Sequence, residues 1–369
     1  MPPMQSPHLP LLHRRLLRPI VTTMESTKEE ADVEDDQAAA ADLSYPPVFL
    51  ESRGAGRLPA SLCTSAPVID VPVLDLHRLD PVGLRGACRD WGLFRLVHHG
   101  IPPPLSAALQ AQARDLLSLP FDAKRARFSS PGLAYFWGTP ALTLHVKDLN
   151  WLEGLHIPLG RLSSSSSAAE FDGLETFWSL VDEYKQHMAR IARTLFEALA
   201  ADLKLDAWVS ASYLNEHDGT FRIYRYPKCA RADDYFAMEA HTDSSVLSVV
   251  NQDDVGGLQV LRGGGWFCVE PIADTLIVNL GDIMQASISF SESAISDDEY
   301  KSVEHRVTVN RSKERISLCY FGFPMEDGVI TSSRYREFTY REFKEQVQED
   351  IKLSGAKVGL GRFKINNES

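Results

Sequence analysis

The feature that most constrains the fold is a series of short apolar segments between residues 221 and 323. Each is rich in Val, Ile, Leu, Phe or Tyr, and Gly, Asp and Asn separate one from the next. Regularly spaced short strands of this kind are typical of a β-sandwich or a jelly-roll barrel. The triple glycine at 263–265 indicates a hairpin turn, because it lacks the strand-to-helix context of a phosphate-binding loop. We expect strands at 221–226, 246–251, 258–261, 276–280, 303–309 and 316–323.

Upstream of this region, helical and extended patterns alternate. Apolar residues recur every three or four positions from Leu174 to Leu199, with the stem of Lys185 included, and this periodicity predicts a long helix. We expect the helix to pack against a sheet; a partner-binding face is the alternative. The other predicted segments are extended runs at 68–76 and 92–100 and helices at 84–91, 105–119 and 337–351.

Together these patterns predict a mixed α and β protein with a β-sandwich or jelly-roll core backed by helices. An α/β segment is expected to precede that core. We expect a disordered leader at 1–45, an N-terminal segment with backing helices at 46–210, the core at 211–325 and a C-terminal helical extension at 326–369.

The leader has an unusual charge pattern. It contains Arg14, Arg15 and Arg18 but no acidic residue before Met24, after which an acidic stretch runs to Asp36. An Arg-rich, acid-free leader is typical of a transit peptide, although this one is poor in Ser. We favour Met24 as the alternative start over plastid targeting.

Composition excludes several classes of function. The formal net charge of -12 argues against a nucleic-acid partner, because phosphate binding relies on clustered Lys and Arg. No apolar run approaches the roughly 18 residues that cross a membrane. The five cysteines lack C-x-x-C spacing, which argues against a disulfide framework or a zinc site and for a reducing compartment. We expect a cytoplasmic protein, with the nucleus as a further location.

His241 and Asp243 are the first residues that carry chemistry. On a strand, residues i and i+2 point to the same face, so the imidazole and the carboxylate would converge. A third ligand from another strand would complete the two-His, one-carboxylate set of non-haem Fe(II) oxygenases. Alone the pair is a weak signal, since a single His in an apolar run is commonly a hydrogen-bonded core residue. His305 is the candidate for the third ligand.

Arg315 and Ser317 form a second group, which begins ten residues after His305. Their spacing also places both side chains on one face of a strand. Arg binds a carboxylate through a planar two-point fork that Lys cannot reproduce, and a buried guanidinium needs an anion. A diacid that chelates the iron at one end would supply that anion at the other; a surface salt bridge is the alternative for Arg315.

Further motifs complete a resemblance to plant 2-oxoglutarate- and Fe(II)-dependent dioxygenases, which covers residues from about 68 to 363. Segments 87–94 and 97–101 resemble the N-terminal part of that family, and segments 256–260, 278–282 and 302–306 resemble its barrel. Within the family the chain is most similar to gibberellin 2-beta-dioxygenases, particularly the branch that acts on twenty-carbon gibberellins. Segments 151–158, 225–227, 298–305, 346–350 and 357–363 carry this closer resemblance.

The resemblance implies a double-stranded β-helix, which is a jelly-roll fold, and a role for each site residue. The implied Fe(II) ligands are His241, Asp243 and His305. Arg315 and Ser317 would bind the distal carboxylate of 2-oxoglutarate, and Tyr226 would give this co-substrate a hydrogen bond. Sister enzymes often carry Asn where this chain has Tyr224, so that contact is absent or replaced.

The implied reaction is the 2-beta-hydroxylation of a gibberellin, which inactivates the hormone. It consumes dioxygen and converts 2-oxoglutarate to succinate and carbon dioxide, and ascorbate is expected to support it. The substrate pocket should be mostly apolar, with one or two cationic groups for a carboxylate, and the sequence does not choose among the Arg and Lys residues. Phe321 and Phe323 are candidates for its mouth, with core packing as the alternative. The same chemistry on a flavonoid or another terpenoid is the alternative function.

Residues 287–294 depart from the family pattern as an eight-residue insertion that precedes His305. A surface loop would absorb them at small cost, because loop-closure entropy grows only logarithmically with length. If they displaced the strand of His305, the chain would be a non-catalytic barrel that acts as a binding protein. We expect a surface loop to absorb the eight residues without displacing the strand of His305.

Overall fold

A computed structural model describes most of the chain. The described residues are 43–51, 66–138, 150–161, 173–205, 213–230, 232, 235–286 and 300–365. All of them belong to one compact unit, Leu43–Ser369. The insertion at 287–294 and most of the predicted leader lie outside the described residues, and the predicted region boundaries stay predictions.

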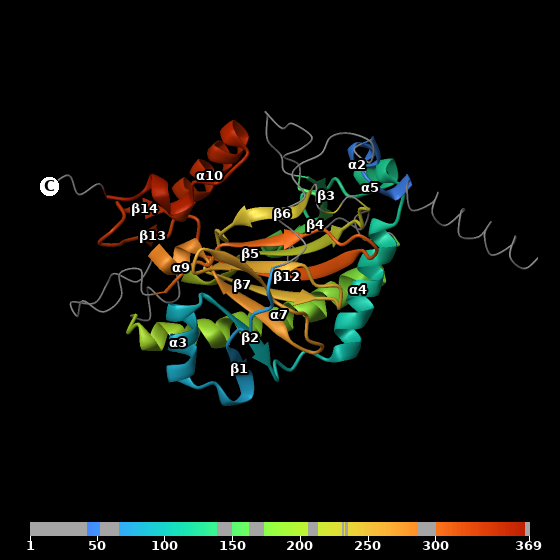
Figure 1. Ribbon diagram of the computed structural model, residues 1–369. Helices are drawn as coiled ribbons and strands as arrows, with labels where there is room; N and C mark the ends of the chain where they lie inside the picture. The colour runs from blue at the N-terminus through green and yellow to red at the C-terminus, as the bar shows by residue number, and fades with distance from the viewer. Residues whose placement is uncertain are drawn as a thin grey trace, which may run out of the picture. The chain divides into compact units, whose positions relative to one another are not determined.

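Two main sheets form the core of this unit (Figure 1). The larger sheet has eight strands in the order β1-β2-β10-β7-β12-β5-β4-β3. In that order the strands are Val73–Asp75, Leu93–Val97, Leu276–Leu280, Leu247–Gln252, Arg315–Phe323, Asn215–Tyr226, Glu153–Pro158 and Ala134–Trp137. All neighbours in this sheet are antiparallel except β1 and β2.

The smaller sheet has four antiparallel strands in the order β6-β11-β8-β9. In that order they are Phe236–His241, His305–Thr308, Leu258–Arg262 and Gly265–Cys268. The hairpin predicted at the triple glycine is confirmed, since β8 and β9 pair across Gly263 and Gly264, both at positive φ. A third sheet contains only β13 (Val329–Ile330) and β14 (Phe338–Thr339). The expected mixed α and β jelly-roll fold is therefore confirmed.

Helices cover the outer face of the larger sheet. The α-helices are α2 (Pro47–Glu51), α3 (Pro81–Asp90), α4 (Pro103–Leu117), α5 (Phe121–Arg127), α7 (Glu175–Asp202), α9 (Asp282–Ala286) and α10 (Tyr340–Ser354). The short 3-10 helices among the described residues are η1 (Leu76–Arg78), η3 (Leu159–Arg161) and η5 (Gly359–Arg362). Helix α7 packs on α3, α4, β7 and β12, so the prediction of a backing helix is confirmed.

The buried face of α7 is broader than the predicted stripe and also includes Phe177, Tyr184, Ala192, Phe196 and Ala200. Tyr184 is fully buried and accepts a hydrogen bond from Asn251 Nδ2 at 2.9 Å, whereas Lys185 is partly exposed and pairs with Asp182. A repeat of 3.6 residues per turn places Tyr184 under Val181 and Met188. The prediction missed Tyr184, while Lys185, of which only the stem was assigned to the stripe, is intermediate in exposure.

Sequence periodicity located the long elements better than the short ones. Strand β6 was not among the predicted strands, because its second half contains exposed Glu239 and Ala240 rather than alternating apolar residues. Helix α10 begins at Tyr340, three residues later than predicted, since Thr339 and Glu342 form a capping box at its start.

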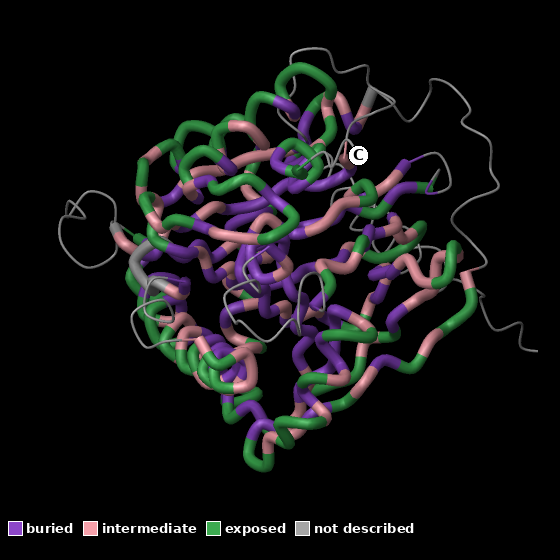
Figure 2. The backbone as a smooth tube through the Cα atoms, turned by 90° about the vertical axis from the view of Figure 1, so that its left-hand side faces the viewer, coloured by how far each residue is buried: buried purple, intermediate pink, exposed green. Residues whose placement is uncertain are grey.

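Buried residues gather in the middle of the unit, whereas exposed residues lie mainly at its periphery (Figure 2). The largest apolar cluster lies between the larger sheet and its helices. A second cluster joins the inner faces of the two sheets and includes Tyr224, Tyr226, Ala237, Val307 and Cys319. Because the strands of both sheets contribute to this second cluster, the side chains that face it line one shared interior.

Two findings bear on the predicted cellular context. Within the part of the chain that the structure describes, no helix is both long and apolar enough to cross a membrane. The four described cysteines, Cys88, Cys229, Cys268 and Cys319, are all free thiols.

Candidate metal centre

His241 and His305 come from neighbouring strands of the smaller sheet. His241 is the last residue of β6 and His305 the first of β11, and the two are paired across the antiparallel register. Their ring centroids lie 4.4 Å apart. The register therefore brings together two imidazoles that are 64 positions apart in the sequence.

Asp243 completes the cluster from a turn. One of its oxygens, Oδ1, lies 3.8 Å from the Nε2 atom of His241 and 3.8 Å from that of His305. The three ligand atoms all lie within 4.8 Å of one another, which allows them to hold one metal ion. The prediction that Asp243 shares a strand with His241 was wrong, because β6 ends at His241 and the turn carries the carboxylate inward.

A set of hydrogen bonds orients these three side chains. The Nδ1 atoms of His241 and His305 lie 2.7 Å and 3.1 Å from the carbonyl oxygens of Glu239 and Val303. In each ring the Nδ1 proton is thus committed to a carbonyl, which leaves Nε2 as a lone-pair donor.

The carboxylate of Asp243 is held on its other oxygen. Ser248 Oγ on β7 donates a hydrogen bond of 2.6 Å to Asp243 Oδ2, and Asn279 Nδ2 on β10 donates one of 3.4 Å. Oδ1 is consequently the oxygen that faces the two histidines. Ser248 was not among the predicted site residues, and Asn279 was expected only as part of the 278–282 motif.

The protonation states of the cluster suit a divalent metal. Burial, together with the nearby His305, lowers the pKa of His241 to about 4. Burial alone would raise the pKa of Asp243, but His305, His241 and the hydrogen bond from Ser248 lower it. Near neutral pH the cluster therefore offers a neutral His241 imidazole beside a carboxylate, the forms that bind metal.

Arg315 lies on the inner face of β12 and is 3 % exposed. Its Nη2 atom donates to Gln252 Oε1 at 3.0 Å, and its guanidinium lies 4.7 Å from the centre of the Tyr226 ring. Its Nε atom has no hydrogen-bond partner, and no acidic side chain among the described residues forms an ion pair with it. The surface-salt-bridge alternative was therefore wrong, and the guanidinium has room for an anion.

Ser317 and Tyr226 lie beside Arg315 in the same interior. Arg315 Nη1 donates to Ser317 Oγ at 3.5 Å, and Ser317 Oγ donates to the Tyr226 hydroxyl at 3.4 Å. The register pairs Arg315 with Tyr226 and Ser317 with Tyr224 across β12 and β5. The structure thus brings all six predicted site residues to the inner faces of the two sheets or to the turn after β6.

The donor set identifies the chemistry that such a site supports. Two imidazoles and one carboxylate leave coordination positions open on one face of an iron ion, as in non-haem Fe(II) oxygenases. The pattern of the 2OG-Fe(II) oxygenase superfamily matches residues 214–324, which include all six site residues. That of the non-haem dioxygenase N-terminal region, described from morphine synthesis, matches residues 67–191.

Known proteins decide the family. The chain is 35% identical to gibberellin 2-beta-dioxygenase 6 of Oryza sativa subsp. japonica, over 80% of this chain and 85% of that protein. It is 32% identical to gibberellin 2-beta-dioxygenase 8 of Arabidopsis thaliana, over 87% of this chain and 95% of that protein. The chain belongs to the plant 2OG-Fe(II) dioxygenases. It is an enzyme of this type, as the sequence predicted.

Solved structures agree with this assignment. The crystal structure of JOX2 in complex with 2OG, Fe and JA is 27% identical, with a TM-score of 0.65, and covers 82% of this chain and 94% of that one. The structure of the dioxygenase for auxin oxidation in rice is 26% identical, with a TM-score of 0.62, over 80% and 100% of the two chains. A dioxygenase of this family uses Fe(II) and 2-oxoglutarate.

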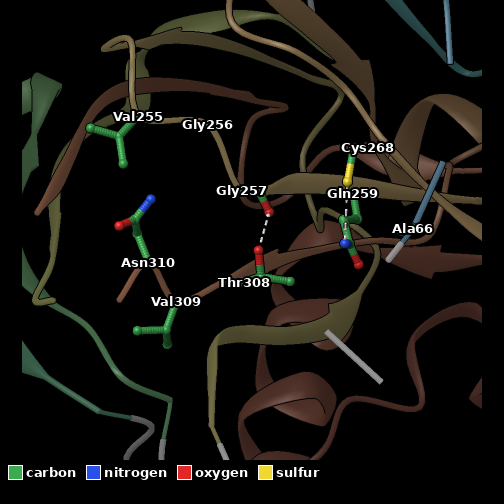
Figure 3. A pocket seen from close by; sticks show the side chains of 9 residues that line it. All are labelled: Ala66, Val255, Gly256, Gly257, Gln259, Cys268, Thr308, Val309 and Asn310. Atoms are coloured by element: carbon green, nitrogen blue, oxygen red, sulfur yellow. Dashed lines mark hydrogen bonds between the residues drawn. The ribbon is translucent and has the colours of Figure 1, made fainter. Parts of the chain in front are cut away.

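A pocket elsewhere in the fold is unsuited to this chemistry (Figure 3). Its lining includes Gln259 on β8, Cys268 on β9 and Thr308 on β11. Gln259 accepts a hydrogen bond from Arg306 at 2.8 Å, so it lies on the face of the smaller sheet opposite to His305. No cationic side chain lines the pocket, and we assign it no role in the reaction.

Proposed function

We propose that this dioxygenase hydroxylates a gibberellin, by the 2-beta-hydroxylation that inactivates the hormone. In this proposal His241, Asp243 and His305 hold Fe(II). Arg315 and Ser317 bind the distal carboxylate of 2-oxoglutarate, and Tyr226 gives this co-substrate a hydrogen bond. The observation that carries the co-substrate assignment is the buried Arg315 guanidinium without a carboxylate partner among the described residues. An anion is needed there, because a buried unpaired charge is costly.

The gibberellin assignment is supported by the relatives. Four curated relatives at 31% to 35% identity, each covering 80% or more of this chain, are gibberellin 2-beta-dioxygenases from Oryza sativa and Arabidopsis thaliana. Relatives at 28% identity have other names, such as jasmonate-induced oxygenase 4 of Arabidopsis thaliana. A gibberellin is therefore the first substrate to test.

The residues of the chain supply position and electrostatics. When bound, iron would supply dioxygen activation and the oxidation of both organic molecules. The Ser248 and Asn279 hydrogen bonds keep Asp243 Oδ1 turned toward the metal position, and the carbonyls of Glu239 and Val303 fix the imidazole rings. Arg315 is almost excluded from water, which strengthens its attraction for a carboxylate.

The test is succinate release by the purified full chain with Fe(II), 2-oxoglutarate, ascorbate and a panel of gibberellins. The panel also contains a flavonoid and a non-gibberellin terpenoid acid. We expect turnover with a gibberellin and a hydroxylated product. Asp243→Ala should lower turnover by at least about 100-fold, since even the loss of an outer-shell partner costs 10- to 100-fold. The matched control is Asp254→Ala, which removes an exposed carboxylate outside the site.

Each other result has a separate meaning. Turnover with the flavonoid or the terpenoid alone would keep the chemistry and reject the substrate. No turnover and no iron binding would favour the non-catalytic barrel that the insertion at 287–294 raised. Deletion of residues 287–294 then shows whether the insertion is the cause, because the shortened chain would regain iron binding.

A further inference from the structure

A second guanidinium without an acidic partner lies in the same interior as the proposed iron site. Arg222 is on β5, four residues before Tyr226, so alternation places its side chain on the same face of the sheet as Tyr224 and Tyr226. The register places Arg222 opposite Cys319 on β12 and opposite His156 on β4. Arg222 thus belongs to the inner face that Arg315 also occupies, nearer to β4.

The hydrogen-bond partners of Arg222 are neutral. Its Nε atom donates to His156 Nδ1 at 3.1 Å, and its Nη1 atom donates to the Tyr224 hydroxyl at 3.2 Å. Burial, followed by the nearby Arg222 charge, lowers the pKa of His156 to about 4. Burial also raises the pKa of Tyr224, despite the opposing effect of Arg222. Both groups are therefore uncharged near neutral pH, and neither one balances the guanidinium.

No carboxylate among the described residues compensates for this charge. None of them forms an ion pair with Arg222. Arg225, three residues later on the opposite face of β5, contacts the carboxylates of both Glu153 and Glu314. A charge that lacks such partners in a largely buried position is costly unless a ligand supplies the anion.

Aromatic rings surround the guanidinium. Arg222 lies 5.9 Å from the centre of the Phe136 ring and 5.6 Å from that of Phe321. Phe136 also makes an edge contact with Tyr224, with ring centres 5.6 Å apart. The result is a cation between apolar ring faces, which suits an organic acid with a large apolar body.

Glycine at position 154 makes this arrangement possible. A Cβ atom there would lie 2.8 Å from the Phe136 ring and 2.2 Å from the carbonyl oxygen of Ile223. Because Gly154 has no side chain, Phe136 can lie over β4 and reach Tyr224. The aromatic wall beside Arg222 therefore depends on a residue within the 151–158 segment that resembles the gibberellin 2-beta-dioxygenases.

The surroundings of Arg222 also adjoin the proposed co-substrate site. The ring of Tyr224, whose hydroxyl accepts a hydrogen bond from Arg222, stacks on that of Tyr226, with ring centres 6.0 Å apart. A ligand held by Arg222 would consequently lie beside the residues proposed to bind 2-oxoglutarate, within the interior that the two sheets share.

We propose that Arg222 binds the carboxylate of the hydroxylated substrate, with His156 and Tyr224 positioning its guanidinium and Phe136 and Phe321 flanking the apolar body. This inference rests on the proposed function and names the cation that the sequence could not choose. Arg315 would then hold the carboxylate of 2-oxoglutarate, and Arg222 that of the substrate. Each of the two guanidinium groups would thus bind one of the two acids.

The test compares a twenty-carbon gibberellin with its methyl esters, using the full chain with Fe(II) and 2-oxoglutarate. Wild type should have a higher kcat/KM for the free acid than for the ester in which the carboxylate bound by Arg222 is methylated. Arg222→Met should lower kcat/KM for the acid by about 10- to 100-fold, the worth of a charge-assisted hydrogen bond, mainly through KM. The same variant should leave the rate for that ester nearly unchanged, and KM for 2-oxoglutarate should not move.

Two further variants keep the test decisive. Arg222→Lys retains the charge and should keep part of the preference for the acid, so it serves if the Met variant does not fold. Arg125→Met removes an exposed arginine on α5 and should change neither substrate constant.

The outcomes separate this inference from the proposed function. Equal losses on acid and esters in Arg222→Met would make Arg222 a structural residue and overturn the inference. Equal wild-type rates for the acid and every ester would overturn it as well, while the gibberellin assignment stands. If wild type turns over neither the acid nor the esters, the gibberellin assignment fails, and the inference fails with it.

Discussion

The two faces of strand β5 differ in whether their positively charged side chains have acidic partners. On the outer face, Arg225 donates to Glu153 at 2.9 Å and to Glu314 at 2.6 Å, and Lys124 donates to Glu153 at 2.6 Å. On the inner face, Arg222 has only neutral hydrogen-bond partners, and Arg315 on the adjacent strand likewise has no acidic one among the described residues. The outer charges are satisfied by the fold, whereas the inner charges remain available to ligands.

The outer network also ties distant segments together. Lys124 Nζ donates to the carbonyls of Ser44 and Leu117 at 2.7 Å and 2.8 Å, and Tyr45 donates to Glu314. Each buried charge there has both an opposite charge and additional hydrogen bonds, the condition under which burial of ions is tolerated. Burial of a cation therefore does not by itself indicate a ligand site. Burial without an anionic partner is the feature that indicates one.

The largest effect on stability should come from breaking the outer network. Glu153→Gln removes the charge shared by Lys124 and Arg225, and should lower the free energy of unfolding by about 3–5 kcal/mol. Urea denaturation measures this loss. Glu197→Gln, on the exposed face of α7, is the control and should have almost no effect. A loss from Glu153→Gln as small as that of the control would mean that the outer charges are not structural.

A smaller effect should come from the C-terminal element beside the iron site. Lys357 Nζ donates to the carbonyl of Thr242 at 2.5 Å and to Asp282 Oδ2 at 2.7 Å, so it holds the turn between His241 and Asp243. Lys357→Met should weaken Fe(II) affinity by about 10-fold, as for other outer-shell contacts. Metal titration of the apoprotein checks this, with the exposed Lys352→Met as control. Unchanged affinity would show that the turn needs no support from Lys357.

The smallest effect concerns the pH dependence of stability. The pKa of His156 is about 4 in the folded protein, against 6.5 for an ordinary histidine. Between these values the unfolded state binds the additional proton, so stability contributed by neutral His156 is present above pH 6.5 and falls as the pH drops toward 4. His156→Gln should reduce this slope by at most about 1.4 kcal/mol per pH unit.

The measurement is urea denaturation at several pH values from neutral to acidic. The exposed His77→Gln is the matched control and should leave the slope unchanged. If His156→Gln has the same slope as wild type, His156 is not held neutral. His156 would then not count as a neutral partner of Arg222.

Sequence patterns predicted the long elements and the proposed metal ligands, but not the tertiary details that distinguish the two faces of β5. The period of α7 and the apolar runs of β10 and β12 are strong enough to locate those elements. Strands β3 and β4 were not predicted as strands, and they contribute Phe136 and His156. The sequence therefore contained the residues around Arg222 without showing that they meet.

The choice among cations could not come from sequence for a physical reason. The chain has 38 Lys and Arg residues. Whether one of them is free to bind a ligand depends on whether an acidic side chain lies beside it in the folded structure. Arg222 and Arg225 are three residues apart, yet strand alternation sends one to the interior and the other to Glu153. Only the register among β4, β5 and β12 separates the charge that is paired from the one that is not.

The most direct test of the central claim is the thermal unfolding of Arg315→Met, with and without Fe(II) and 2-oxoglutarate. Without ligands, the variant should be as stable as wild type or more stable, because replacing a buried charge by an apolar side chain of similar size is often neutral or stabilising. With saturating 2-oxoglutarate, wild type should gain about 3 kcal/mol at 100 times the dissociation constant, and the variant should lose most of this gain. A variant that is destabilised as strongly as Glu153→Gln and is still stabilised fully by 2-oxoglutarate would contradict the claim that the inner charges are kept for ligands.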